Sequence, residues 1–341
     1  MDSKTIKELV ILCKERGISG FSGKNKNQLL KLLTVDDPIN GPILGAFVIG
    51  DNLKLLKDAM SESINLIYMD PPYNTGRDFY YFEDRFDDFP KFMEARLKEC
   101  FRILKKDGNI IIHVEPKISH HIRVICDSLN FHFKNEIVWN SGGNSKNKHQ
   151  LGRNHDTLIV CSKSAKSKFF PMYHDYPCEY KNKLKMCPVN NKLYSTSAAH
   201  NSQPEVNPRP NLNYTWNGNT KQWYISLEKM QELHNESRLE YNTSGIPRIK
   251  RFLDELEGIP VRDTWDDISS IQGSEKTRYA TQKPIKLLER IIQLYSAETD
   301  ICLDPFAGSG TLGRACIKLN RNYLLFDINP EAKEVFNETI H

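Results

Sequence analysis

Three short apolar runs in the chain each end in an acidic residue, and this repetition is the main pattern of the sequence. The runs are 64–69 before Asp70, 301–303 before Asp304, and 323–326 before Asp327. Apolar runs of this length, followed by turn residues, predict strands buried on both faces of a parallel sheet. The carboxyl ends of such strands form the edge at which open α/β sheets bind ligands. The pattern therefore predicts an α/β fold with acids at its ligand-binding edge.

The turn after the first strand is unusually stiff. Pro71 and Pro72 fix φ and lack a backbone donor, so Asp70 stays extended and the chain cannot continue directly into a helix. Asp70 and Tyr73 are thereby presented on one rigid loop. Residues 70–73 resemble the Asp-Pro-Pro-Tyr signature of S-adenosylmethionine-dependent DNA amino-methyltransferases, which methylate the exocyclic nitrogen of adenine or cytosine.

A glycine-rich turn after the second strand agrees with this resemblance. Residues 304–311 read Asp-Pro-Phe-Ala-Gly-Ser-Gly-Thr, and glycines at a helix start let the backbone approach a ligand. The turn is neither the Gly-x-Gly-x-x-Gly fingerprint of dinucleotide enzymes nor a P-loop. It is similar to the cofactor loop of the same methyltransferases. This likeness implies that S-adenosylmethionine is bound by Asp304, Phe306, Gly308, Gly310 and Thr311, with Asp327 accepting hydrogen bonds from the ribose.

Two further segments match the family. Asp51 stands in its Gly-Asp pair, which implies a place near the adenine amino group of the cofactor, although Asp51 could also cap the helix that follows. Residues 281–284 read Thr-Gln-Lys-Pro, which implies that Thr281 and Lys283 bind the methionine end, with Lys283 paired to its carboxylate. Pro284 is expected as the first residue of a helix.

The order of these segments predicts the architecture. The catalytic loop comes first and the cofactor loop last, which matches the β group of these enzymes, a circularly permuted arrangement. The resemblance implies a Rossmann-like, seven-stranded methyltransferase sheet in permuted order, with an inserted target-recognition region and a small N-terminal helical domain. The expected boundaries are 1–34 for the helical domain, 35–44 for a linker, 45–163 for the catalytic half, 164–263 for the insertion, and 264–341 for the cofactor half.

The resemblance also implies a mechanism. The Asp70 carboxylate and the Pro71 carbonyl accept the two hydrogens of the target amino group, while Pro72 stiffens the loop and Tyr73 stacks on the flipped base. In the family, Asp at the first motif position usually accompanies adenine and Ser cytosine, so N6-methyladenine in duplex DNA is the expected product. N4-cytosine methylation, RNA methylation, and a non-catalytic nucleic-acid-binding protein with this fold are the alternatives.

The charge excess of the chain lies in its first tenth. Residues 1–34 hold seven Lys and Arg against three acids, whereas the remainder has 40 of each. A capping box at Thr5 and Glu8 opens the first of two short predicted helices, and Lys24 lies in the loop between them. This arrangement resembles a SAP domain, a DNA-binding helical hairpin. A basic amphipathic arm packed on the catalytic core is the alternative.

Further basic residues suit contacts to DNA phosphates. They lie in a polar loop and beside aromatic residues of the insertion, and they are Lys146, Lys148, Arg153, Arg248, Lys250 and Arg251. The spacing of His and Cys in the insertion matches no standard zinc finger, so no metal site is predicted.

The remaining composition bears on the location and partners of the protein. The chain has no apolar run of about 20 residues and no signal peptide, and its eight cysteines form no Cys-x-x-Cys pair. A soluble, intracellular protein with reduced cysteines is therefore expected. Double-stranded DNA is the expected partner and a membrane is not. A separate restriction nuclease and a second copy of the chain are further candidate partners.

Removal of residues 1–34 is expected to weaken DNA binding about equally on all sequences and to reduce its salt dependence. The reason is that basic contacts to phosphate carry no base information. Anisotropy titrations of several unrelated duplexes over a range of salt concentrations measure both effects. A changed methylation site with unchanged affinity would contradict this assignment.

Overall fold

The computed structural model describes residues 5, 7, 25–26, 44–74, 78–79, 82–83, 86–142, 149, 151–271, 273–279 and 281–340. Most of the predicted SAP-like hairpin, including Lys24, and the loop residues Lys146 and Lys148 lie outside the described residues. The chain divides into two compact units. The first comprises Met1–Pro171 and Arg262–His341, and the second comprises Met172–Val261.

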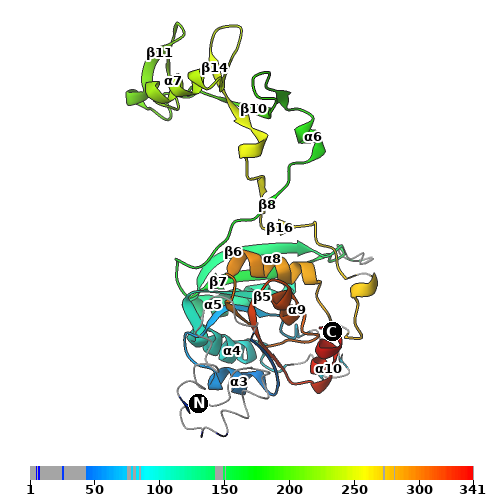
Figure 1. The fold of residues 1–341 in the computed structure, drawn as a ribbon. Coiled ribbons are helices and arrows are strands. Elements are labelled where there is room, and N and C mark those ends of the chain that lie inside the picture. Colours follow the sequence, from blue (N-terminus) through cyan, green and yellow to red (C-terminus); the bar gives the residue numbers. More distant parts are fainter. Residues whose placement is uncertain are drawn as a thin grey trace. The chain divides into compact units, whose positions relative to one another are not determined.

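The first unit is built on a mixed sheet (Figure 1). In the described residues its order is β1-β18-β17-β2-β5-β7-β6-β16. These strands are β1 (Gly45–Ile49), β2 (Ile64–Met69), β5 (Leu104–Val114), β6 (His132–Asn140), β7 (His155–Ser162), β16 (Thr264–Trp265), β17 (Ile301–Asp304) and β18 (Asn322–Asp327). β7 runs antiparallel to β5 and to β6, whereas the other neighbours are parallel.

The predicted number of seven strands is wrong for the described part of the chain, because β16 adds an eighth. This strand has two residues, which is too short to show a periodic pattern in the sequence. Its Trp265 is buried, and the indole Nε1 donates to the carbonyl of Arg262 at 2.7 Å. The burial of this ring, and not a run of apolar residues, therefore anchors the strand beside β6.

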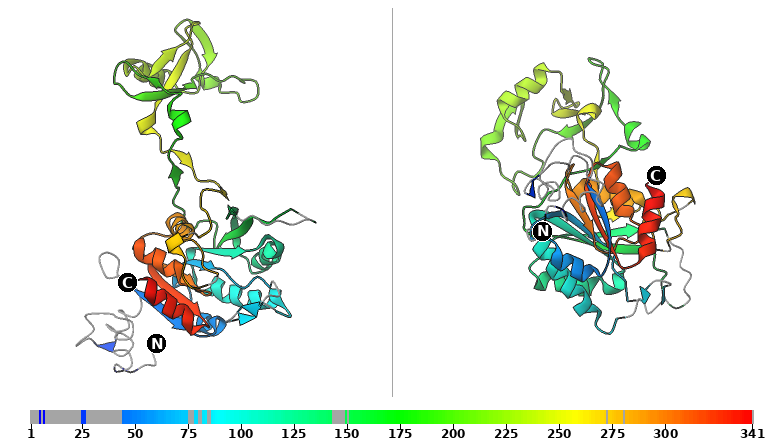
Figure 2. Two further views of the ribbon diagram at one scale, coloured as in Figure 1. Left: turned by 90° about the vertical axis from the view of Figure 1, so that its right-hand side faces the viewer. Right: turned by 60° about the horizontal axis from the view of Figure 1, so that its bottom comes forward.

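Helices cover both faces of the sheet (Figure 2). One group packs together as α3 (Asn52–Asp58), α4 (Phe89–Ile103) and α5 (Pro116–Ser128), and the other as α8 (Ile285–Tyr295), α9 (Thr311–Lys318) and α10 (Pro330–Thr339). Short elements β3 (Asp78–Phe79), β4 (Phe82–Glu83) and η3 (Gly273–Glu275) lie in connections. The amphipathic pattern explains these positions, since α8 buries Leu287, Leu288, Ile291, Ile292, Leu294 and Tyr295.

The start of α8 differs from the prediction. Pro284 is the cap residue before the helix and not its first residue, because its ψ of 137° is extended. The helix begins at Ile285, whose backbone N–H donates to the carboxylate of Glu275 at 2.6 Å. An acidic side chain from η3 therefore satisfies a helix-terminal donor that Pro284 has no side-chain oxygen to satisfy.

The second unit has its own sheet and core. Its elements are β8 (Tyr173–His174), α6 (Cys178–Lys181), β9 (Lys185–Met186), β10 (Leu193–Ala198), η1 (Pro210–Leu212), β11 (Asn213–Trp216), β12 (Asn219–Gln222), α7 (Leu227–Asn235), β13 (Leu239–Tyr241), β14 (Pro247–Phe252), η2 (Leu253–Glu255) and β15 (Ile259–Pro260). The order β13-β14-β10-β9 forms a four-stranded antiparallel sheet. Trp223, Met230 and Ile249 lie in its apolar core. Target recognition by this region stays a prediction.

No helix in the described part of the chain is long and apolar enough to cross a membrane.

The Gly310→Ala substitution is expected to destabilise the first unit more than Gly142→Ala. Both glycines have positive φ, 71° and 76°, so alanine costs about 1 kcal/mol at each. A Cβ at Gly310 would overlap the buried ring of Phe336, whereas one at Gly142 meets nothing within 4 Å. The overlap should add a further ~1 to 3 kcal/mol. Urea unfolding of both variants measures the difference, and equal losses would contradict the predicted overlap.

Candidate functional site

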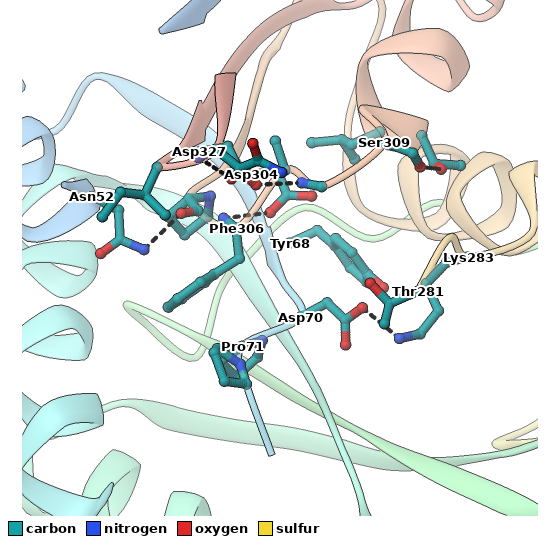
Figure 3. Close-up of a pocket in the computed structure, with 18 of the residues that line it drawn as sticks. Asn52, Tyr68, Asp70, Pro71, Thr281, Lys283, Asp304, Phe306, Ser309 and Asp327 are labelled. Carbon is teal, nitrogen blue, oxygen red and sulfur yellow. Dashed lines mark hydrogen bonds and ion pairs between the residues drawn. The ribbon is translucent and has the colours of Figure 1, made fainter. Parts of the chain in front are cut away.

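A cavity of about 530 Å³ lies in the first unit, where β2, β17 and β18 end. It brings together segments that are far apart in the sequence (Figure 3). The predicted site residues that line it are Asp51, Asp70, Pro71, Pro72, Tyr73, Thr281, Lys283, Asp304, Phe306, Gly308, Thr311 and Asp327. Gly310 does not line the cavity and instead caps α9 in the left-handed conformation.

The catalytic candidate Asp70 is held through both carboxylate oxygens. The Tyr73 hydroxyl donates to Oδ1 and the Lys283 ammonium pairs with Oδ2. Lys283 Nζ also lies 3.2 Å from the Tyr73 hydroxyl oxygen. Burial and the charge of Asp70 raise the pKa of Tyr73 well above its usual range, so this phenol remains a neutral donor. The three groups therefore form one connected polar cluster.

This cluster gives Lys283 a partner that the sequence did not indicate. The prediction paired Lys283 with the carboxylate of a cofactor, whereas the structure pairs it with the side chain of Asp70. Figure 3 shows these two labelled side chains facing each other. Both are largely shielded from water, with 16% of each side chain exposed, which strengthens their attraction. Lys283 thus neutralises and orients the catalytic candidate in this geometry.

The glycine-rich turn is organised by two acids. Asp327 Oδ2 accepts from the backbone N–H of Gly308 at 2.7 Å, and its Oδ1 accepts from Asn329 N–H at 2.9 Å. Asp304 Oδ1 accepts from Phe306 N–H at 2.9 Å. Burial raises the pKa of Asp304 well above its usual range and also raises that of Asp327. Each acid therefore holds the backbone of the turn while lining the cavity.

Asp51 fulfils the capping role that was one of its two predicted functions. Its side chain accepts from the Lys54 N–H at 3.0 Å at the start of α3. Its other oxygen lies 3.6 Å from a guanidinium nitrogen of Arg96. The carboxylate also lines the cavity, so capping leaves its predicted cofactor contact open.

Asn52 is a buried connector that sequence reasoning missed. Its amide nitrogen donates to the Pro305 carbonyl at 2.8 Å, and its oxygen accepts from Arg96 Nε at 2.7 Å. The guanidinium carbon of Arg96 lies 3.5 Å from the centre of the Phe92 ring. Asn52 thus ties α3 and α4 to the turn after β17. An Asn directly after the Gly-Asp pair was the available signal, but its partners lie too far along the chain to be inferred.

Other cavity residues were also missed. They include Tyr68, Phe86, Phe92, Glu115, Tyr279, Ile328 and Asn329. Ile328 and Asn329 directly follow Asp327, and their position after the acid was a usable signal. Tyr279 packs against the turn, since its ring would lie 3.1 Å from a Cβ at Gly308.

The predicted DNA contacts have different environments. Arg153 pairs with Glu115 in the first unit. In the second unit, Arg248 and Arg251 are exposed on β14, where Arg248 Nε donates to Thr196 at 2.9 Å and Arg251 Nε to Ser197 at 3.4 Å. These hydroxyl contacts still leave other guanidinium donors for a phosphate.

The phosphate contact predicted for Lys250 does not fit its observed position. The residue is 8% exposed, and its ammonium donates to the Ser237 carbonyl at 2.9 Å. The nitrogen also lies 5.2 Å from the centre of the Tyr194 ring. Because its ammonium is directed into the second unit, Lys250 does not present it to a ligand surface.

A comparison with known proteins identifies the family of the chain. A family model described as DNA methylase, for N6 and N4 methyltransferases, matches residues 64–338. The chain belongs to this family. The prediction of a DNA methyltransferase is therefore confirmed.

Two curated relatives of this methylase cover most of both chains. The DNA adenine methyltransferase YhdJ of Escherichia coli K12 is 30% identical over 289 residues, which are 83% of this chain and 78% of the relative. The type II methyltransferase M.HpaI of Haemophilus parainfluenzae is 28% identical over 294 residues, covering 84% and 71%. The crystal structure of an M1.HpyAVI-SAM complex shares the fold, with a TM-score of 0.50, 17% identity, and coverage of 87% of this chain and 100% of that chain.

Replacement of Asn52 by Ala is expected to destabilise the methylase by about 1 to 3 kcal/mol, because it removes the hydrogen bonds that Asn52 makes with Arg96 Nε and with the Pro305 carbonyl. Urea unfolding gives the free-energy change. Lys57→Ala, at an exposed position of the same helix, is the matched control and should change stability little. Similar small losses in both variants would show that the connector contributes nothing.

Proposed function

We propose that this methylase transfers a methyl group from S-adenosylmethionine to the N6 amino group of adenine in duplex DNA. The observation that carries the proposal is the position of Asp70, which lines the same cavity as the glycine-rich turn and is held there by Tyr73 and Lys283. The family membership supports methyl transfer to DNA. The adenine activity named for the relative YhdJ supports the choice of base.

The cavity fits the proposed cofactor. Its volume of about 530 Å³ lies within the usual range for sites that hold small molecules. Carboxylates of Asp51, Asp70, Glu115, Asp304 and Asp327 line it, and among the described lining residues Arg96 and Lys283 carry the positive charges. The oxygen acceptors on this wall suit a ligand with an ammonium group, a positively charged sulfur and ribose hydroxyls. When bound, S-adenosylmethionine supplies the methyl group on that sulfur.

The residues of the catalytic loop then act on the base. The lone pair of an exocyclic amino nitrogen is delocalised into the ring until its hydrogens are drawn toward acceptors. Each Asp70 oxygen keeps a lone pair beyond its contact with Tyr73 or Lys283, and the Pro71 carbonyl is a second acceptor. Pro72 keeps the loop stiff, and the Tyr73 ring stacks on a base turned out of the duplex.

The chain order supports assignment to the permuted β group. β2, with the catalytic loop, precedes β17 and β18, with the cofactor loop and Asp327, although β2 and β17 are neighbours in the sheet. Thr281, Lys283 and Thr311 complete the proposed cofactor site, and Gly310 shapes its backbone.

DNA is held through basic groups of several segments. In this proposal the phosphate contacts come from Arg248 and Arg251 on β14, from Arg153, Lys146 and Lys148, and from the SAP-like segment with Lys24. Residues 164–263 carry target recognition.

The type III restriction-modification enzyme StyLTI Mod subunit of Salmonella typhimurium is 23% identical over 338 residues, and a separate restriction nuclease is the partner proposed on this basis. A homodimer stays a prediction.

Asp70→Ala is expected to lower single-turnover methylation by about 10²-fold or more, while affinity for S-adenosylmethionine changes little, because the carboxylate acts on the reacting amino group. Single-turnover assays and calorimetry measure the two effects separately. Asp127→Asn, an exposed carboxylate paired with Arg123 on α5, is the control and should leave both values unchanged. Turnover within tenfold of the parent would make Asp70 a structural residue.

The product is expected to be N6-methyladenine. Mass spectrometry of nucleosides from duplex DNA treated with the methylase identifies it directly. N4-methylcytosine without N6-methyladenine would overturn the choice of base and leave the fold and the family intact. Methylation of RNA in preference to duplex DNA would overturn the substrate class.

A further inference from the structure

A row of three hydrogen-bonded side chains crosses the central strands and has no role in the steps above. The Tyr68 hydroxyl on β2 lies 2.9 Å from Nδ1 of His113 on β5. Nε2 of His113 lies 3.2 Å from Oδ2 of Asp156 on β7. Tyr68 is 2% exposed and His113 is fully buried, with its ring nearly perpendicular to that of Trp139. Because β2, β5 and β7 are neighbours, the row runs across the sheet.

The surroundings of this row fix which atom is the donor in each of its two hydrogen bonds. Burial and the charge of Lys283 lower the pKa of His113, so the imidazole is neutral and has one N–H. Burial alone would raise the pKa of Asp156, but the hydrogen bond from His113 and the charges of Lys283 and Arg153 lower it, so the carboxylate is ionised. A carboxylate only accepts, so His113 Nε2 carries the proton and Nδ1 accepts from Tyr68.

The direction of these hydrogen bonds determines whether the Tyr68 hydroxyl can act as a donor or only as an acceptor toward a ligand. Burial and the charges of Asp70 and Asp304 raise the pKa of Tyr68 well above its usual range, so the phenol keeps its single proton. That proton is donated to His113, so the remaining lone pair can only accept. Donation toward the anionic Asp156 through His113 polarises the phenol and makes its oxygen more negative.

Tyr68 lies between the two halves of the proposed site. It precedes Asp70, the first residue after β2, by two positions, and both residues line the cavity. Leu303 pairs with Ile67, which places Tyr68 beside Asp304 at the end of β17. Figure 3 shows the labelled Tyr68 side chain between Asp304 and the Asp70–Lys283 pair.

We propose that the Tyr68 oxygen selects the positively charged methyl donor over the neutral product that remains after transfer, and that His113 and Asp156 are its positioning residues. This inference rests on the proposed use of S-adenosylmethionine. A fixed, partly negative oxygen in a shielded cavity attracts a cationic methyl–sulfur group more than an uncharged thioether. The row therefore limits occupation of the site by S-adenosylhomocysteine.

Calorimetry of the full chain with S-adenosylmethionine and with S-adenosylhomocysteine tests the proposal. The quantity measured is the ratio of the two dissociation constants. Tyr68→Phe should reduce the preference for the charged ligand by about fivefold, which corresponds to one ordinary hydrogen bond. Asp156→Asn keeps an acceptor for His113 but removes the charge, and it should change the ratio in the same direction by a smaller factor.

Tyr295→Phe is the matched control. Tyr295 is a buried tyrosine of the same unit that does not line the cavity, and its replacement should leave the ratio unchanged. Loss of affinity by the same factor for both ligands in Tyr68→Phe, or no loss, would overturn the inference and make the row a structural element. If Tyr68→Phe does not fold, an unchanged ratio in Asp156→Asn overturns it.

The failure of this inference differs from a failure of the proposed function. A parent protein that binds neither ligand and does not methylate DNA would remove the cofactor assignment, and the inference with it. A parent protein that methylates adenine and binds both ligands, with the same ratio in Tyr68→Phe, would remove only the inference.

Discussion

The site depends on the pairing of β2 between β17 and β5. All residues of β2 are buried, and both of its neighbours run parallel to it. Parallel strands end at the same edge, so residues that leave β2 and β17 meet there although they are far apart in the sequence. The loss of the β2–β17 pairing would separate Asp70 from Asp304. The apolar burial that stabilises the sheet is therefore also what assembles the cavity.

Concentration of carboxylates at one edge has an electrostatic cost, and the structure offsets it in two ways. Asp304 and Asp327 accept from backbone N–H groups of the turn, whereas Asp70 has the ammonium of Lys283. Backbone donors fix the geometry of the turn without adding a full positive charge beside the cavity. Lys283 acts in the opposite way, because its full positive charge compensates Asp70, the carboxylate proposed to receive the N–H groups of the target base.

Local features of the site could be predicted from the sequence, because short segments determine them. The apolar run 64–69 coincides with β2, and the prolines that follow it account for the loop. The capping role of Asp51 follows from a side chain and a backbone N–H three residues apart. Such signals need no knowledge of the remaining chain.

Partners distant in sequence could not be predicted. Lys283 was expected near a cofactor. Its pairing with Asp70 depends on the fold, which brings the segment before α8 to the end of β2. The burial of Lys250 depends on the position of Ser237 and Tyr194 beside β14. Two-residue strands such as β16 have no periodic pattern, and their position is fixed by the burial of one ring.

The second unit begins and ends at one point, because β8 pairs with β15 and the Val261 N–H donates to the Met172 carbonyl at 2.8 Å. When the two ends of an inserted unit lie together, the unit does not change the distance that the surrounding chain has to bridge. It can therefore be exchanged by recombination for a body of another size while the sheet of the first unit keeps its connections. If this unit reads the DNA sequence, new specificities could arise as replaceable cassettes, without any change to the residues that perform methyl transfer.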